Sequence, residues 1–200
     1  MAELRSFIFL DRLQPQTMCY LGTWVRGSLP RADHAAQIIE VAPGLDIEPL
    51  TDVALKHADV GAGILFVERQ FGYLEMHGLP SSVRSAADAV LHQLGATAAS
   101  ATRPQVLASR IVPKIDRQHA FLINRNKIGS MALPGQSMFV LEMQPASYAI
   151  LAANEAEKSA RITLVDYRMA GATGRLYLTG TESEVRAAAE AAEAALEAVA

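Results

Sequence analysis

The pattern of hydrophobic and polar positions divides the first half of the chain into alternating strands and helices. Short apolar runs bounded by glycine or proline predict strands over residues 5–13, 36–41, 60–68 and 73–77. Apolar residues at helical spacing predict helices over residues 46–58 and 81–94, with Ser81 or Ser82 as the cap of the second. Pro15 suits the first turn of a short helix that reaches about residue 25. Together these elements indicate a small α+β domain.

The same pattern occurs a second time. Residues 1–98 align with residues 103–200 at a constant shift of 102 without a gap, and 20 of the 98 positions are identical. The clearest matches pair Lys56 with Lys158, Gly72 with Gly174 and Gly78 with Gly180. Such self-similarity decides the architecture before any single motif does. We therefore expect two tandem domains, 1–98 and 103–200, each with its own core and joined by a short linker.

Composition limits the class of protein. Half of the residues are hydrophobic, which suffices for a core and leaves apolar surface for subunit contacts. The net charge of -3, with basic residues scattered through both halves, does not suggest nucleic-acid binding. Cys19 is the single cysteine, so an intrachain disulfide is excluded, and we expect its thiol to pack in the core. The sequence shows neither a secretory signal nor a membrane span, and we expect a soluble cytoplasmic protein without a membrane partner.

Candidate catalytic chemistry is sparse. The sequence contains no HExxH, CxxC, GxSxG or GxxxxGK[ST] motif, and its five histidines do not pair at metal-ligand spacing. The glycine-rich segment 170–175 is predicted to join two strands rather than to open a helix, so its N–H groups would not form a phosphate cradle. It is either a plain loop or a loop that lines an opening in an oligomer. We expect no enzymatic activity, cofactor or metal.

Residues 156–191 carry a recognisable motif series. Ala156-Glu157-Lys158-Ser159-Ala160 leads into a strand, a small glycine-rich loop, a strand that ends in Gly180, and an alanine-rich helix. This order resembles the bacterial microcompartment (BMC) shell domain, and residues 54–89 repeat it. Ile111-Val112-Pro113-Lys114 resembles the edge motif of that family but stands at the start of its repeat. The chain is therefore similar to the circularly permuted tandem shell proteins, of which the ethanolamine-utilisation trimeric shell protein is the best-known type.

This resemblance implies two ferredoxin-like domains per chain and a homotrimer with pseudo-sixfold symmetry. Such a trimer would tile edge to edge with other shell proteins around encapsulated enzymes. Its central pore would pass small metabolites and be lined by Glu68, Arg69, Gln70, Phe71 and Gly72 from one repeat and by Arg168, Met169, Ala170, Gly171, Ala172, Thr173 and Gly174 from the other. Unlike loops around a threefold axis permit a gate, and stacking of two trimers is also compatible with the family.

The family's edge cations correspond to Lys56, Lys158, Arg12 and Lys114. Lys127-Ile128-Gly129-Ser130 spells the pore motif of ordinary hexameric shell proteins, but it precedes the second strand of its repeat, and we interpret it as a connecting loop.

Two questions stay open at this point. Phe71 and Met169 are bulky apolar residues in otherwise small or polar loops, and they either constrict the opening or fold back onto the core. Small α+β domains also form rings in ligand-sensing regulatory oligomers, so a sensor is the alternative to a shell protein, ahead of a catalytic or purely scaffolding role.

Overall fold

The computed structural model describes residues 2–31 and 33–199. The chain divides into two compact units, Met1–Arg103 and Pro104–Ala200.

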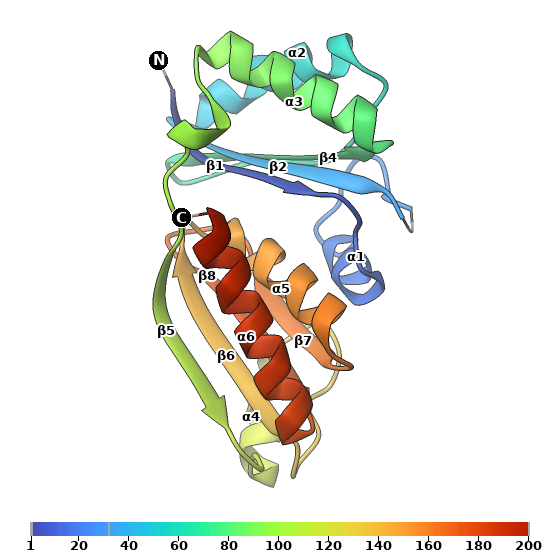
Figure 1. The fold of residues 1–200 in the computed structure, drawn as a ribbon, viewed down its shortest axis with the longest axis vertical. Coiled ribbons are helices and arrows are strands. Elements are labelled where there is room, and N and C mark those ends of the chain that lie inside the picture. The colour runs from blue at the N-terminus through green and yellow to red at the C-terminus, as the bar shows by residue number, and fades with distance from the viewer. Residues whose placement is uncertain (1, 32, 200) are drawn as a thin grey trace. The chain divides into compact units, whose positions relative to one another are not determined.

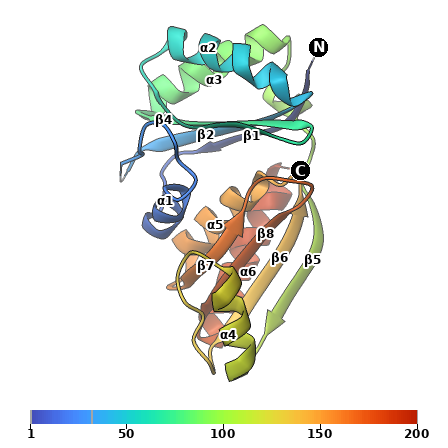
Figure 2. The same ribbon diagram turned by 180° about the vertical axis from the view of Figure 1, so that it is seen from behind.

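The first unit is an antiparallel sheet with two helices on one face and one on the other (Figures 1 and 2). Its elements are β1 (Glu3–Leu10), α1 (Pro15–Leu21), β2 (Ala35–Ala42), the 3-10 helix η1 (Gly44–Asp46), α2 (Ile47–His57), β3 (Gly61–Glu68), β4 (Phe71–Gly78), α3 (Pro80–Leu94) and the 3-10 helix η2 (Ala98–Ser100). The strand order is β1-β2-β4-β3, which places β4 between two neighbours. Helices α2 and α3 cover one face, while α1 lies on the opposite face.

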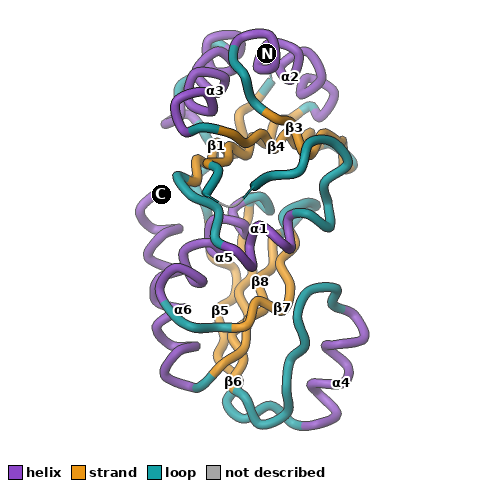
Figure 3. The backbone as a smooth tube through the Cα atoms, turned by 90° about the vertical axis from the view of Figure 1, so that its right-hand side faces the viewer, coloured by secondary structure: helices purple, strands orange, loops and turns teal. Residues whose placement is uncertain are grey.

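The second unit repeats this arrangement. Its elements are β5 (Gln105–Val112), α4 (Arg117–Asn126), β6 (Ser137–Gln144), α5 (Tyr148–Ser159), β7 (Thr163–Arg168), β8 (Gly174–Gly180) and α6 (Glu182–Val199). The strand order β5-β6-β8-β7 is the same as in the first unit. The tube drawing shows α5 and α6 on one side of these strands and α4 on the other (Figure 3).

Irregularities of the two sheets coincide at the shift of 102. The register of β1 slips between Leu4 and Ser6, and that of β5 slips between Val106 and Ala108. A second slip lies between Ala62 and Ile64 in β3 and recurs between Leu164 and Asp166 in β7. Bulges are specific local features of a sheet, so their recurrence shows that the two units share one fold in the register that the sequence predicts.

The helix-covered face holds the main core of the first unit. Ile39 and Leu74 of the sheet pack with Ile47, Leu50 and Val90 of the two helices. On the other face, the rings of Trp24, Phe66 and Tyr73 form a stack with centroid separations of 6.2 and 5.0 Å. Strand β4 is therefore buried on both faces from Phe71 to His77. Burial on both faces also encloses the polar side chains of Glu75 and His77.

Several predicted boundaries are wrong. The first strand ends at Leu10 rather than residue 13, and the short helix ends at Leu21, directly before Gly22. Helix α3 has Leu79 at its N-cap because Pro80 occupies the first helical turn, so neither serine caps it. Cys19 is exposed, since α1 buries Thr17, Tyr20 and Leu21. The 127–130 segment lies between α4 and β6, as the connecting-loop interpretation requires.

Candidate functional site: two hairpin loops and the helix ends

The two hairpins β3–β4 and β7–β8 occupy equivalent places but have different loops. In the first unit, β3 and β4 are joined by Arg69 and Gln70 alone, and Arg69 adopts the left-handed conformation with φ 57°. In the second unit, residues 169–173 separate β7 from β8. One unit therefore presents a tight charged turn and the other a wider loop of small residues.

Gly72 and Gly174 occupy equivalent places near the start of β4 and of β8, and packing accounts for them. A Cβ atom at Gly72 would lie 2.1 Å from the carbonyl oxygen of Gly44, and one at Gly174 would lie 2.3 Å from the carbonyl oxygen of Ala146. Real side chains do not tolerate such distances to backbone atoms. Both glycines are buried and hold the end of the hairpin against the segment that leads into α2 or α5.

An arginine–glutamate pair supports the base of each loop. In the first unit, Arg5 Nε lies 2.9 Å from Glu40 Oε1, and the Arg5 guanidinium lies 4.1 Å from the centre of the Phe71 ring. Glu40 is buried, so this pair joins β1 to β2 beneath the turn.

In the second unit, the glutamate contacts the loop itself. Thr173 Oγ1 donates a hydrogen bond to Glu142 Oε1 over 2.8 Å, and Arg175 Nε donates to the same oxygen over 3.1 Å. The hydrogen bond from Thr173, followed by that from Arg175, holds the pKa of Glu142 below its ordinary value. Neither glutamate was predicted as a site residue from the sequence, although Glu40 and Glu142 are identical at the shift of 102, a signal that could have identified them.

Burial separates the predicted pore residues into two groups. Glu68, Arg69, Gln70, Arg168 and Ala172 are exposed, and Gly171 and Thr173 are half-buried. Phe71, Gly72, Met169, Ala170 and Gly174 are buried. Phe71 and Met169, which the sequence places either in the opening or back on the core, retain only 9% and 1% exposure in the single chain.

The predicted edge lysines stand at equivalent helix ends. Lys56 and Lys158 lie in the last turns of α2 and α5, and both are exposed. Lys56 Nζ lies 2.5 Å from Asp52, and Lys158 Nζ lies 3.6 Å from Glu155, so each pairs with an acid of its own helix. A cation is favoured at a helix C-terminus, and these ion pairs leave most of each lysine side chain available to a neighbour.

Arg12 and Lys114 also occupy equivalent exposed positions, each two residues after the end of the first strand of its unit. Arg12 Nε lies 2.7 Å from Asp33, and Lys114 adopts the left-handed conformation with φ 47°. The structure therefore keeps all four predicted edge cations at the surface, in two equivalent pairs.

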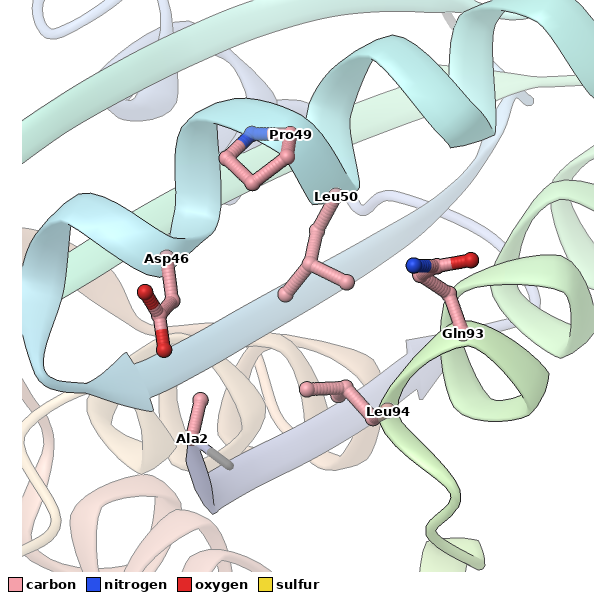
Figure 4. Close-up of a pocket in the computed structure, with 6 residues that line it drawn as sticks. All are labelled: Ala2, Asp46, Pro49, Leu50, Gln93 and Leu94. Carbon is pink, nitrogen blue, oxygen red and sulfur yellow. The ribbon is translucent and has the colours of Figure 1, made fainter.

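The first unit contains a small, mostly apolar pocket. Figure 4 shows a pocket of about 160 Å³ in the first unit, where Ala2, Pro49, Leu50 and Leu94 surround a mostly apolar space with Asp46 and Gln93 at its border. Residues 2–31 and 33–199 contain no group of three metal-ligating side chains. None of the helices described is long and apolar enough to cross a bilayer.

Comparison with protein families assigns both units. Residues 4–100 match the CsoS1D N-terminal domain, and residues 137–200 match the BMC domain. The carboxysome shell protein CcmP of Synechococcus elongatus is 45% identical over 196 residues, which cover 98% of this chain and 92% of CcmP. The carboxysome shell protein CsoS1D of Hydrogenovibrio crunogenus is 44% identical over 198 residues, with 98% and 97% covered.

Two solved structures are closely similar over nearly the whole chain. The fused permuted hexameric shell protein MSM0275 from the RMM microcompartment has 70% identity and a TM-score of 0.97, with 98% of each chain covered. The double ringed trimeric shell protein MSM0271 from the same microcompartment has 44% identity and a TM-score of 0.96, with 99% of this chain and 97% of the other covered.

Proposed function

The chain belongs to the family of tandem-BMC-domain trimeric shell proteins of bacterial microcompartments, and we propose that its two hairpin loops line the central pore of the trimer. It is a structural shell protein rather than an enzyme, and its two domains are circularly permuted. The sequence similarity to shell proteins favours this function over the alternative of a ligand-sensing regulatory oligomer. The cargo enzymes and the metabolite are properties of each particular shell and are not implied by the family.

The observation that carries the pore proposal is the equivalence of the two hairpins. They stand at the same place in two copies of one fold, and a threefold axis would bring each kind of loop into a ring three times. A supported loop keeps its side chains in fixed places, and both loops rest on an arginine–glutamate pair at their base.

The charges of the exposed loop residues give this pore its selectivity. Each chain contributes the acid Glu68 and the bases Arg69 and Arg168, all of them exposed. Three copies of each near one axis create a local field that acts on charged metabolites. Because Glu68 and Arg69 are adjacent, a rotation of either side chain changes both the width and the charge of the opening.

Permeability of assembled shells tests the proposal. We expect Arg69→Gln combined with Arg168→Gln to slow the entry of small anions and to leave neutral solutes unaffected, because the change removes six positive charges from each trimer. Flux of a charged and a neutral solute into shells reconstituted from each variant gives the measurement. Asp88→Asn, an exposed charge on α3, is the control. If the double variant formed intact shells with unchanged anion flux, these loops would not line the pore.

We propose that the contacts between neighbouring trimers lie at the edges of each trimer. Lys56, Lys158, Arg12 and Lys114 are the side chains that we assign to lateral contacts with other shell proteins, so that the tiles enclose the encapsulated enzymes. Face-to-face stacking of two trimers is a further assembly, favoured by the description of MSM0271 as double ringed.

A further inference from the structure

A polar hollow of about 380 Å³ lies in the first unit at the start of α3. The segment before β2, the segment before β3, the end of β4 and the first turn of α3 form its walls. Its lining residues are Ser28, Leu29, Arg31, His34, Asp59, Gly61, His77, Gly78, Leu79 and Ser82. The hollow is separate from the hairpin turn at Arg69, which lies at the other end of β3 and β4.

A buried histidine forms the floor of this hollow. His77 is 1% exposed, and its Nδ1 atom lies 3.0 Å from Oε1 of the fully buried Glu75. The other ring nitrogen, Nε2, is buried without a hydrogen-bond partner among the described residues. An unsatisfied buried polar atom is costly, so a ligand or water in the hollow would stabilise the site.

Two glycines of β3 make room for the pair. A Cβ atom at Gly61 would lie 2.8 Å from His77 Nε2, and one at Gly63 would lie 2.3 Å from Glu75 Oε2. The corresponding residues of the second unit are Thr163 and Val165. That unit also has Tyr177 and Thr179 where the first has Glu75 and His77. The two glycines and the Glu75–His77 pair therefore occur together in the first unit and not in the second.

The walls of the hollow supply hydrogen-bond donors. The α3 N-cap is Leu79, which provides no side-chain hydrogen bond to the first turn, and Ser82 of that turn faces the hollow. A helix N-terminus attracts anions. Arg31 adds a positive charge, and its backbone N–H donates to His34 Nδ1, so a neutral His34 carries its proton on Nε2.

We propose that this hollow binds the carboxylate or phosphate group of a small metabolite, with His77 Nε2–H and Arg31 as its main donors. Asp59 is the acidic residue at the rim of the hollow. It is exposed, so solvent screens the negative charge of its side chain more than it screens a charge on the buried residues of the floor. Each trimer would hold three such sites, because the second unit lacks the histidine, the arginine and both glycines.

Binding of an anion is coupled to a proton. When the Glu75 carboxylate is ionised and the His77 imidazole is neutral, the ring proton lies on Nδ1 and Nε2 cannot donate. His77 donates from Nε2 only after the Glu75–His77 pair has taken up one further proton. Burial raises the pKa of Glu75 above its ordinary value, against the opposing hydrogen bond from His77, and so helps the pair to keep that proton. His34, Arg31 and Asp59 are the other titratable groups that face the pair across the hollow. Binding should therefore tighten as the pH is lowered and the pair takes up this proton.

Calorimetry on the full-length protein tests this proposal with two probes, inorganic phosphate and acetate. We expect at least one of them to bind once per chain, and the arm that binds identifies the anionic group. Arg31→Met should weaken binding about tenfold, because hydrogen bonds to charged groups contribute on this scale. Gly61→Ala should abolish binding, since the added Cβ fills the space beside His77 Nε2.

Arg26→Met is the matched control, because Arg26 is an exposed arginine of the same segment that does not line the hollow. Thermal melting establishes that each variant is folded, and Arg31 is exposed, so its replacement keeps the test valid even if Gly61→Ala does not fold. The proposal is overturned if neither anion binds, if Arg31→Met binds as the wild type does, or if the affinity for the fully ionised form of the probe does not increase as the pH is lowered.

Discussion

Phe71 and Met169 illustrate how burial decides the role of a residue in a loop. Their sequence context, among small and polar neighbours, left a choice between constricting the pore and packing inward. In the structure, Phe71 lies beneath the Arg5 guanidinium, and Met169 is almost fully enclosed. The hydrophobic pattern alone could not settle this, because the two-residue turn before Phe71 and the five-residue loop that contains Met169 are too short to have a periodicity that assigns their faces.

Replacing either residue should therefore affect stability rather than permeability. We expect Phe71→Gly and Met169→Gly each to lower the free energy of unfolding by roughly 3 kcal/mol or more, because the removed side chain leaves a cavity. Denaturant unfolding of the two single variants measures this. Gln70→Ala, an exposed change in the same turn, should stay within about 0.5 kcal/mol of the wild type. If Phe71→Gly instead had normal stability and gave shells of higher permeability, the Phe71 side chain would be shown to constrict the pore.

At the scale of elements, the sequence predicted each α-helix and strand of the first repeat, because apolar spacing and the glycine and proline positions agree with each other, but it did not predict the 3-10 helices η1 and η2. What the sequence could not show is contact between elements distant along the chain. The Glu40–Arg5 pair, the hollow above His77 and the close approach at Gly72 all depend on strand order, which local patterns do not encode.

The segment between α4 and β6 depends on one such contact. Lys127 Nζ lies 2.9 Å from Asp166 Oδ2 and 3.9 Å from the centre of the Tyr177 ring, so the ion pair joins the start of this segment to β7 and β8. Burial raises the pKa of Asp166 to about 6, although Arg168 opposes the shift. The folded state therefore binds more protons at this carboxyl than the unfolded state between about pH 4 and 6.

Since the pKa of Asp166 is higher in the folded state, its contribution to stability is present below about pH 4 and is lost as the pH rises through 6. One pKa unit corresponds to about 1.4 kcal/mol, so Asp166→Asn should change the difference in unfolding free energy between pH 4 and 7 by about 2 kcal/mol. Urea unfolding across this range, with Asp88→Asn as the control, tests it. A pH profile that Asp166→Asn leaves unaltered would contradict the assignment.

At the scale of the whole molecule, our proposal assigns the lateral contacts between trimers to the paired helix ends. Replacing Lys56 and Lys158 together with Asp should leave the trimer intact and abolish extended sheets, because both lysines are exposed at equivalent helix ends. Electron microscopy of sheets and native mass spectrometry of trimers give the two readouts. Arg186→Asp on α6 is the control, since Arg186 is also an exposed helical cation paired within its helix. Normal sheets from the double variant would show that the tile edge lies elsewhere.

The most direct test of the central claim is a cryo-electron microscopy reconstruction of the assembled protein. We predict a threefold ring of three chains. Three copies of the β3–β4 turn at Arg69 and three copies of the β7–β8 loop at 169–173 should alternate around the central opening. A reconstruction that places either hairpin at the outer rim, or that shows particles without threefold symmetry, would contradict the pore that we propose.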